Sequence, residues 1–362
     1  MKAAVCRAVG QVAVEEIDEP RPRSGEVALE MVATGVCGTD LSIFRGHLPS
    51  PFPIVLGHEG VGVVREVGPE VRSLAVGDHV VCTIIPSCGR CFYCVRGEDP
   101  LCEEIVVYTG KMLDGTTRLA SRGEPIHSLS YQASFAERAI VPERVAIRVP
   151  REAPLERLVG LACGVSTGLG AAMLRAPVEP GTSVLVVGAG GVGLSVLMGA
   201  RLRGAGLRIA ADIVPARLER AKALGLAEHV IDTRHEPLAE RVRALTGGRG
   251  ADRAFDAAGA PGTLEAAVDA TRPGGSVVAI GLADVKLTAT LPTRALLRQR
   301  WVTGTFGGSI APRRDIPAFV DLYLAGHLDL EALLDATYRL DELPRAFDDL
   351  AHGRVTRGAL RF

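Results

Sequence analysis

Apolar positions are spaced differently in the two halves of this chain. Up to about residue 150, short valine-rich runs are cut by glycine and proline, as in residues 26–35, 53–68 and 77–86. Runs of this length with such frequent punctuation are typical of a compact, mostly antiparallel β domain with long loops. The pattern therefore predicts a mostly-β first domain.

Beyond residue 165 the pattern becomes an alternation of apolar runs and helical stretches. The apolar runs are residues 183–190, 207–214, 229–233, 251–259 and 276–282. Stretches with helical spacing, such as 215–225 and 237–247, separate them. Strands that alternate with helices predict a doubly wound α/β domain, whose parallel sheet is covered on both faces.

The end of the chain carries a third pattern. Residues 318–334 and 341–354 have the spacing of amphipathic helices, and residues 358–362 have the composition of a short strand. We expect this tail to pack back on the first domain. The predicted organisation is a first domain of residues 1–164, completed by 307–362, and a second domain of residues 165–306.

Charge excludes some classes of partner. The 41 basic and 42 acidic side chains nearly cancel, and no basic stripe stands out. Neither a nucleic acid nor an anionic membrane is therefore an expected partner. The first 20 residues lack the apolar run of a signal peptide, so we expect a cytoplasmic location, where thiols stay reduced.

One uncharged stretch, residues 182–200, has the length of a membrane helix. However, several glycines between Gly188 and Gly193 interrupt it directly after a run of valines. A buried strand, a glycine turn and a helix explain this arrangement better than a membrane span does.

Four of the eight cysteines crowd into one short segment, at positions Cys88, Cys91, Cys94 and Cys102. A disulfide knot, a redox pair and a metal site compete to explain them. In a reducing compartment, clustered cysteines are more often metal ligands than bridges, and this spacing suits one tetrahedral zinc ion (Zn2+). An iron–sulfur cluster and unmetallated thiols remain alternatives. Four thiolates leave zinc no open position, so the predicted zinc is structural.

A glycine turn predicts a dinucleotide site. Gly188, Gly190 and Gly193 form a G-x-G-x-x-G motif, with Gly191 and Val192 between them, after a predicted strand and at the start of a predicted helix. Glycines let the backbone approach a pyrophosphate, which the helix N-terminus attracts. The alternative is a turn needed only for packing.

Asp212 ends the strand that follows this helix. A carboxylate there accepts hydrogen bonds from the ribose hydroxyls and repels a 2′-phosphate, which predicts NAD rather than NADP. Arg217, one turn further on, either lies near the adenosine or is an exposed arginine on the helix surface.

Several segments together resemble the zinc-dependent medium-chain alcohol dehydrogenases. They are the four-cysteine loop, the G-H-E-x2-G-x5-G-x2-V motif that begins at Gly57, the stretch after the glycine turn, residues 112–119, residues 306–309 and the tail 353–362. The resemblance covers essentially the whole chain and is strongest to the branch near the liver-type and glutathione-dependent formaldehyde-oxidising enzymes. It implies a GroES-like catalytic domain joined to a Rossmann domain, an active site in the cleft between them, and a homodimer or homotetramer.

The same resemblance implies a catalytic zinc ion held by Cys37, His58 and Cys163. Taken singly, each has an ordinary alternative, because thiols are commonly buried and a histidine in a glycine loop needs no special role. Two thiolates and a neutral imidazole would leave zinc a fourth position for water or an alcohol oxygen.

Further roles follow from the positions that match the family. Thr39 corresponds to the hydroxyl that takes the alcohol proton, and Asp40 to the carboxylate that orients the histidine ligand. Glu59 corresponds to an acid close to the metal that assists ligand exchange, the alternative being a buried acid paired with an arginine. Thr167 and Arg357 match positions near the nicotinamide and the pyrophosphate.

One departure from the family concerns proton transfer. Ser42 stands where the liver-type branch has a histidine that completes the proton relay. Either Ser42 relays the proton through water, or the proton leaves by another route, with His47 as a candidate.

Together these features predict a zinc- and NAD-dependent alcohol dehydrogenase, which reversibly oxidises a primary or secondary alcohol to an aldehyde or ketone. An oxidase of S-hydroxymethyl adducts of a small thiol is the nearest alternative. A non-enzymatic NAD sensor, a zinc-ribbon binding module and a zinc-free quinone reductase are disfavoured, because all three residues that match the catalytic-zinc ligands are present.

Overall fold

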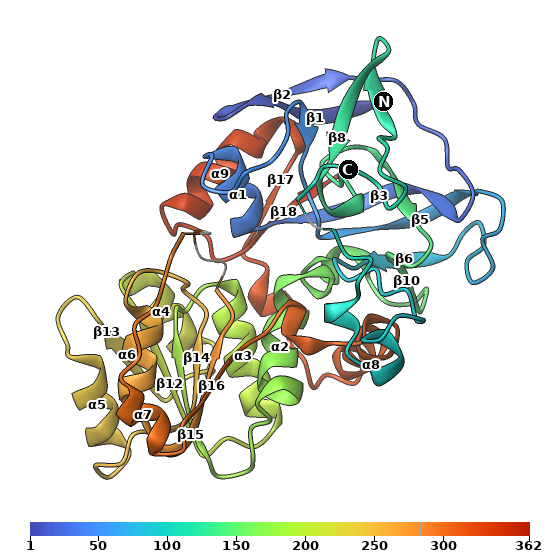
Figure 1. The fold of residues 1–362 in the computed structure, drawn as a ribbon. Coiled ribbons are helices and arrows are strands. Elements are labelled where there is room, and N and C mark those ends of the chain that lie inside the picture. Colours follow the sequence, from blue (N-terminus) through green and yellow to red (C-terminus); the bar gives the residue numbers. More distant parts are fainter. Residues whose placement is uncertain (107, 282–283, 285) are drawn as a thin grey trace. The chain divides into compact units, whose positions relative to one another are not determined.

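The computed structural model describes residues 1–106, 108–281, 284 and 286–362, and they form two compact units (Figure 1). The first unit consists of Met1–Cys163 and Ala311–Phe362, and the second of Gly164–Ile310. The predicted fold class is confirmed, because the first unit is mostly β and the second contains a parallel sheet with helices.

Two sheets form the framework of the first unit. The smaller sheet contains, in spatial order, β2 (Gln11–Glu16), β1 (Lys2–Ala8), β4 (Ile54–Val55), β8 (Glu124–Ser128) and β7 (Leu119–Ser121). The larger sheet contains β10 (Ala146–Val149), β6 (His79–Cys82), β5 (Gly60–Val67), β3 (Glu26–Val36), β18 (Gly358–Arg361) and β17 (Ala336–Tyr338), with β9 (Arg138–Pro142) also beside β3.

The C-terminal strand lies between β3 and β17 in the larger sheet. β18 pairs antiparallel with β3, so that Ala359 lies opposite Gly35. This pairing places the last residues of the chain next to the strand that leads into Cys37. It also buries Leu360 completely.

Aromatic packing fixes the helix that follows Cys37. The helices of this unit are α1 (Gly38–Phe44), α8 (Pro312–Leu324) and α9 (Leu343–Ala351). The ring of Phe347 in α9 stacks on that of Phe44 in α1 at 4.8 Å and lies 6.3 Å from that of Phe135. Aromatic pairs at these distances stabilise a core beyond the area they bury. They hold α1, and therefore its first turn, in place.

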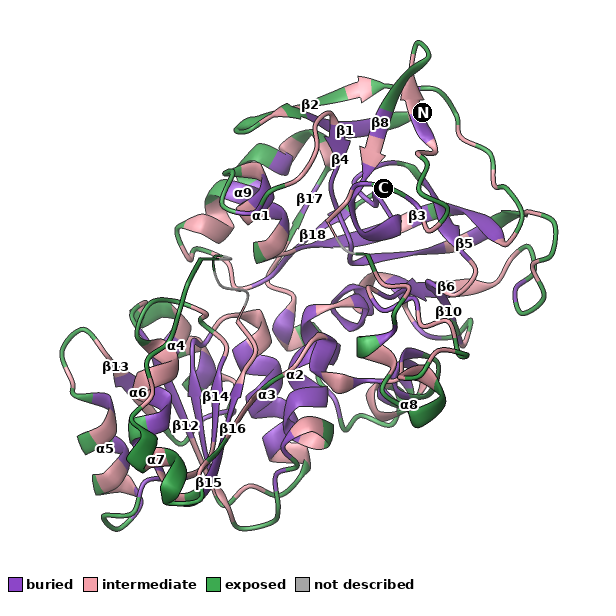
Figure 2. Ribbon diagram, viewed as in Figure 1, coloured by how far each residue is buried: buried purple, intermediate pink, exposed green. Residues whose placement is uncertain are grey.

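The described part of the second unit contains a parallel sheet of six strands. In spatial order they are β13 (His229–Asp232), β12 (Leu207–Asp212), β11 (Ser183–Val187), β14 (Ala251–Asp256), β15 (Thr271–Ala279) and β16 (Trp301–Gly304). The helices are α2 (Gly164–Gly170), α3 (Gly191–Leu202), α4 (Pro215–Ala223), α5 (Leu238–Leu245), α6 (Thr263–Ala270) and α7 (Thr293–Leu297). The central strands are buried (Figure 2).

The order of these strands creates a switch point. From β11 the chain first adds β12 and β13 on one side and then crosses to β14 on the other. In open parallel sheets, ligands bind beyond the carboxyl ends of the strands at such a point. The position between β11 and β14 is therefore the expected ligand site of this unit.

The uncharged stretch 182–200 is not a membrane helix. It forms β11, the glycine turn and most of α3, as its glycines indicated. Across the part of the chain that the structure describes, no helix combines the length and the apolar character needed to cross a membrane.

Candidate metal and dinucleotide sites

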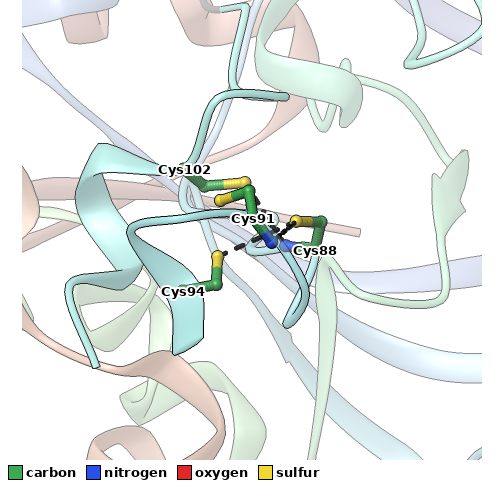
Figure 3. Close-up of side chains that lie close together, drawn as sticks. All are labelled: Cys88, Cys91, Cys94 and Cys102. Atoms are coloured by element: carbon green, nitrogen blue, oxygen red, sulfur yellow. Dashed lines mark hydrogen bonds between the residues drawn. The ribbon is translucent and has the colours of Figure 1, made fainter. Parts of the chain in front are cut away.

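The four clustered cysteines converge on one point of the first unit. The Sγ atoms of Cys88, Cys91, Cys94 and Cys102 all lie within 4.8 Å of one another. Figure 3 shows the side chains turned toward a common centre. All eight cysteines of the chain are free thiols, so the structure does not support the disulfide alternative.

Backbone amides prepare these thiols for a metal. The N–H of Cys91 donates to Cys88 Sγ at 3.3 Å, and the N–H of Cys88 donates to Cys102 Sγ at 3.4 Å. Hydrogen bonds from the N–H groups of Cys94 and Glu103 lower the pKa of the Cys91 thiol to about 6. The backbone therefore favours the thiolate of Cys91, the form in which cysteine binds metals, whereas burial raises the pKa of the Cys94 and Cys102 thiols.

A second group of ligating side chains meets elsewhere in the first unit. Ligand atoms of Cys37, His58, Glu59 and Cys163 lie within 4.8 Å of one another. Cys37 caps α1, His58 and Glu59 directly precede β5, and Cys163 follows a 3-10 turn at Val159–Ala162. Side chains from three separate segments of the chain therefore place their possible ligand atoms close together.

Asp40 orients two of these segments. This carboxylate is completely buried; its Oδ2 accepts the N–H of Cys37 at 3.1 Å, and its Oδ1 accepts the N–H of Gly57 at 2.9 Å. Oδ1 also lies 3.1 Å from Nδ1 of His58. When Nδ1–H donates to this carboxylate, Nε2 presents its lone pair, and Nε2 is buried with no hydrogen-bond partner in the described structure. A carboxylate behind an imidazole whose other nitrogen is free is the usual surrounding of a histidine metal ligand.

Gly57 makes this arrangement possible. Its φ of 89° lies in the left-handed region, and a Cβ there would come within 2.5 Å of the Phe135 ring. A larger residue at this position would displace the loop that carries His58.

The charges of the group favour a divalent cation. A hydrogen bond from Cys163 holds the pKa of Cys37 well below its usual value, and the positive charge of His58 lowers it further. The same hydrogen bond and burial hold the pKa of Cys163 well above its usual value. Burial alone would lower the pKa of His58, but the charges of Asp40 and Cys37 raise it. A metal ion can replace the protons that these crowded groups share.

Glu59 has a second partner. Its buried carboxylate forms an ion pair with the buried guanidinium of Arg357, from the C-terminal segment. Burial raises the pKa of Glu59, while the charge of Arg357 opposes this rise. Gly35 in β3 leaves the space, because a Cβ there would lie 1.9 Å from Glu59 Oε2. Glu59 therefore both pairs with an arginine and lies close to Cys37, His58 and Cys163. A pyrophosphate contact of Arg357 stays a prediction.

The residues expected to move a proton lie on α1. Thr39 and Ser42 are half-buried, and Thr39 Oγ1 lies 3.8 Å from Cys37 Sγ. The N–H of His47 donates to the carbonyl of Ser42 at 2.8 Å, so the chain folds back over the end of this helix. His47 itself is exposed.

Tyr108 is a neighbour of Cys163 and Cys37 that the sequence pattern did not identify. It is half-buried and packs against the core cluster that contains Leu48, with a left-handed φ of 64°. Burial raises the pKa of its phenol, and the negative charges of Cys163 and Cys37 add to this rise. A single tyrosine in a loop belongs to no motif, so only the folded chain reveals its position.

In the second unit, the glycine turn closes as the motif predicts. Gly188 has a φ of 94°, and a Cβ on Gly193 would lie 1.8 Å from the carbonyl oxygen of Gly188. Gly190, at the N-cap of α3, has no atom within 4 Å of the position of a Cβ. Two glycines thus satisfy packing, and the third leaves open space in front of the N–H groups of a helix N-terminus. Such a place suits a pyrophosphate.

Asp212 lies beside this turn. Its Oδ2 accepts the N–H of Ala189 at 2.7 Å, and its Oδ1 accepts the N–H of Val214 at 2.8 Å. The guanidinium of Arg217 lies 3.7 Å from Asp212 Oδ2, so Arg217 is a partner of this carboxylate rather than a free arginine on the helix surface. Thr167 is buried on α2 in the same unit.

Two known families match the chain. Residues 23–151 match the alcohol dehydrogenase GroES-like domain, and residues 191–325 match the zinc-binding dehydrogenase domain. Together these matches cover more than half of the sequence.

Individual relatives match almost from end to end. An NDMA-dependent alcohol dehydrogenase from Amycolatopsis methanolica is 37% identical, over 99% of this chain and 98% of that protein. An S-(hydroxymethyl)glutathione dehydrogenase from Synechocystis sp. is 35% identical, over 100% of this chain and 99% of that protein. The crystal structure of benzyl alcohol dehydrogenase from Acinetobacter calcoaceticus has a TM-score of 0.94 at 34% identity, over 100% of this chain and 99% of that one.

Proposed function

This chain belongs to the zinc-dependent medium-chain alcohol dehydrogenases, and we propose that Cys37, His58 and Cys163 hold its catalytic zinc. The family makes it an oxidoreductase that acts on alcohols with zinc and NAD. The observation that carries the site assignment is the buried, unpartnered Nε2 of His58, which lies with two cysteine thiols in one group. We assign the structural zinc to the four-cysteine loop.

Each residue of the proposed catalytic site has its own task. Bound zinc supplies a Lewis acid, and bound NAD supplies a hydride acceptor. Asp40 keeps Nδ1 of His58 as a donor, so that Nε2 stays available as a ligand. The hydroxyl of Thr39 accepts the proton of the alcohol. Oxidation removes one hydride and one proton, and the alcohol becomes an aldehyde or ketone.

The proton leaves α1 through Ser42 in this proposal. Ser42 follows Thr39 by three residues, so both side chains lie on neighbouring positions of one helix face. A serine hydroxyl both donates and accepts hydrogen bonds, which lets it pass a proton to water. His47 is then not required for turnover.

We propose that the second unit selects NAD through Asp212. Its carboxylate is held by two backbone N–H groups at the end of β12, and each oxygen retains capacity to accept a ribose hydroxyl. A 2′-phosphate would meet this negative charge. Arg217 partly balances the charge, and Gly190 leaves room for the pyrophosphate.

The proposed substrate is a primary or secondary alcohol with an apolar body. Leu48 is almost fully buried in the apolar cluster against which Tyr108 packs, and the phenol of Tyr108 lies near the thiols of Cys163 and Cys37. Relatives with similar sequences are named for S-(hydroxymethyl)glutathione and for alcohols in general, and a similar structure is named for benzyl alcohol.

A steady-state assay tests this function. Zinc-replete protein is given NAD and a panel of primary, secondary and benzylic alcohols, and NADH is followed at 340 nm. We expect NADH with at least one alcohol and none with the Cys37→Ser variant. Formaldehyde oxidation only in the presence of added glutathione would favour the thiol-adduct alternative. No NADH with any substrate would contradict the proposal.

We propose that a second copy of the chain pairs with β16. Among the described strands of its sheet, β16 has a neighbour on one side only. Trp301 on this strand is 48% exposed, and Leu297 just before it is 79% exposed. An open edge with apolar side chains invites strand addition. Antiparallel pairing of two such edges about a twofold axis would join two sheets into one and form a homodimer.

A cytoplasmic location completes the proposal. Both groups of metal-ligating cysteines need reduced thiols, and all eight cysteines of the chain are free. Reducing compartments keep thiols in this state.

A further inference from the structure

A buried carboxylate lies at the switch point of the parallel sheet without a role in the function described so far. Asp256 is the last residue of β14, is 3% exposed, and is paired with Val187, the last residue of β11. Its position is therefore at the carboxyl ends of the two strands between which a ligand of this fold binds.

The carboxylate organises the segment that follows it. Oδ1 of Asp256 accepts the N–H groups of Ala258 at 3.1 Å and Gly259 at 3.2 Å. Oδ2 accepts the hydroxyl of Thr263, the first residue of α6, at 2.9 Å. Burial raises the pKa of Asp256, and these three uncharged donors oppose the rise. The whole turn between β14 and α6 is thus tied to one side chain.

Residues 257–259, which follow Asp256, pack directly against the glycine turn. The N–H of Ala257 donates to the carbonyl of Val187 at 2.8 Å, directly before Gly188. A Cβ on Gly188 would come within 2.7 Å of the Ala258 nitrogen. The two turns are therefore in close contact, and a shift of one displaces the other.

The other side of the segment contacts the next strand. A Cβ on Gly259 would lie 2.7 Å from the carbonyl carbon of Gly281. The N–H groups of Ile280 and Gly281 donate to the carbonyl of Asp256 at 2.8 and 2.9 Å. Asp256 consequently links the ends of three neighbouring strands on the edge where the dinucleotide binds.

We propose that Asp256 is a positioning residue for NAD. Its carboxylate locks residues 257–259 against the glycine turn, on the opposite side of β11 from Asp212. Both sides of the switch point, Asp212 on one and residues 257–259 on the other, are then already ordered before NAD binds. A preformed turn spares the free energy of ordering these residues on binding. This inference rests on the NAD dependence of the family.

A matched pair of variants separates positioning from general stability. Asp252 is the second residue of the same strand, near its amino end, where its Oδ2 accepts the N–H and the hydroxyl of Ser183 at 2.8 and 2.6 Å and its Oδ1 pairs with Arg272. Asp256→Asn keeps one acceptor oxygen and replaces the other with an NH2 that cannot accept, so the charge-assisted hydrogen bond from the Thr263 hydroxyl to this side chain is lost. Asp252→Asn makes the same chemical change away from the proposed cofactor site.

Equilibrium titration of NADH, followed by its fluorescence, is the test. Loss of one such hydrogen bond should weaken NADH binding to Asp256→Asn about tenfold, raise the KM for NAD similarly and leave kcat nearly unchanged. Asp252→Asn should lower the Tm while it binds NADH like the wild type. Thr263→Val, which keeps the carboxylate and removes one donor, should fold and bind NADH with an intermediate affinity.

Two results would overturn the inference. One is wild-type NADH affinity in both Asp256→Asn and Thr263→Val. The other is an equal loss of affinity in Asp252→Asn, because a general loss of stability would then explain the effect. Absence of NADH binding to the wild type would contradict the proposed function, and this inference with it. Normal NADH binding to the wild type, together with either of the two results above, would contradict this inference alone.

Discussion

Asp40 positions the residues of the proposed catalytic zinc site without being one of its proposed ligands. It contacts the backbone before His58, the imidazole itself and the N–H of Cys37. If Asp40 is removed, the imidazole of His58 is free to rotate and the N–H of Cys37 loses its hydrogen-bond acceptor. The sequence alone suggested this role only through the resemblance to a family.

We predict that Asp40→Asn lowers zinc affinity at the catalytic site by about 10- to 100-fold, the usual cost of losing the carboxylate behind a histidine ligand. Competition with a chromophoric chelator measures the affinity, and kcat/KM for an alcohol should fall in parallel. Asp78→Asn is the control, because Asp78 caps a loop of the same unit through the N–H of Ala75 at 2.9 Å. An Asp40→Asn variant with wild-type zinc affinity would contradict the role.

Residues that belong to no local sequence motif could not be assigned a role from the sequence pattern alone. Cys37, His58 and Cys163 are far apart, and no spacing rule joins them, so their assignment depended on resemblance; the structure brings their ligand atoms within 4.8 Å of one another. Tyr108 and Asp256 carry no such signal. Their positions follow from packing and strand pairing, which are properties of the folded chain.

At the scale of elements, the glycines of the turn between β11 and α3 meet two different requirements. Gly193 is required by packing, whereas Gly190 has free space above it. One motif therefore contains both a folding requirement and a binding requirement.

Alanine substitutions should separate the two. Gly193→Ala places a methyl group 1.8 Å from a carbonyl oxygen, and we expect about 1–3 kcal/mol of destabilisation, seen as a lower Tm. Gly190→Ala meets no protein atom, so its Tm should stay close to that of the wild type while NADH affinity falls at least tenfold. Thermal unfolding and NADH titration of both variants are the measurements. A Gly190→Ala protein that binds NADH normally would show that the cofactor does not approach this residue.

The elements themselves were predictable where their signal is local. The apolar runs predicted the strands of the parallel sheet, and the fold class is confirmed. The helix expected at 318–334 was wrong in its bounds: α8 runs from Pro312 to Leu324, because proline suits a first helical turn and Gly326, with a φ of 75°, ends the helix. The pairing of β18 with β3 joins distant residues and leaves no local pattern. The domain boundaries at 164 and 307 stay predictions.

For the whole molecule, exposed ion pairs should determine the response to acid. Hydrogen bonds from Arg90 and Arg144 hold the pKa of Glu104 below its usual value. A carboxylate with a lowered pKa adds stability that is present above its unfolded pKa, near 4.3, and is lost as the pH falls through its folded value. The Tm of the wild type should therefore fall below about pH 4.5. Glu104→Gln should lower the Tm at pH 7, and its Tm should approach that of the wild type as the pH falls below the unfolded pKa of glutamate, whereas a difference independent of pH would contradict this.

The proposed dimer makes a prediction at the same scale. Leu297→Glu should convert a dimer into a monomer, because it places a charge on an exposed apolar residue next to β16. Leu324→Glu, at a 43% exposed leucine of the other unit, should leave the assembly intact. Sedimentation equilibrium measures the mass of each variant. A wild-type protein that is monomeric, or a Leu297→Glu variant with unchanged mass, would contradict pairing at this edge.

Metal analysis of three purified proteins tests the central claim, that one group of cysteines holds a zinc ion for catalysis and another holds one for structure. After metal-replete purification, the wild type should contain two zinc ions per chain. Cys37→Ser should contain one, keep its Tm and lose turnover, whereas Cys91→Ser should contain one and lose stability first. One zinc per chain in the wild type, or two in Cys37→Ser, would contradict the account.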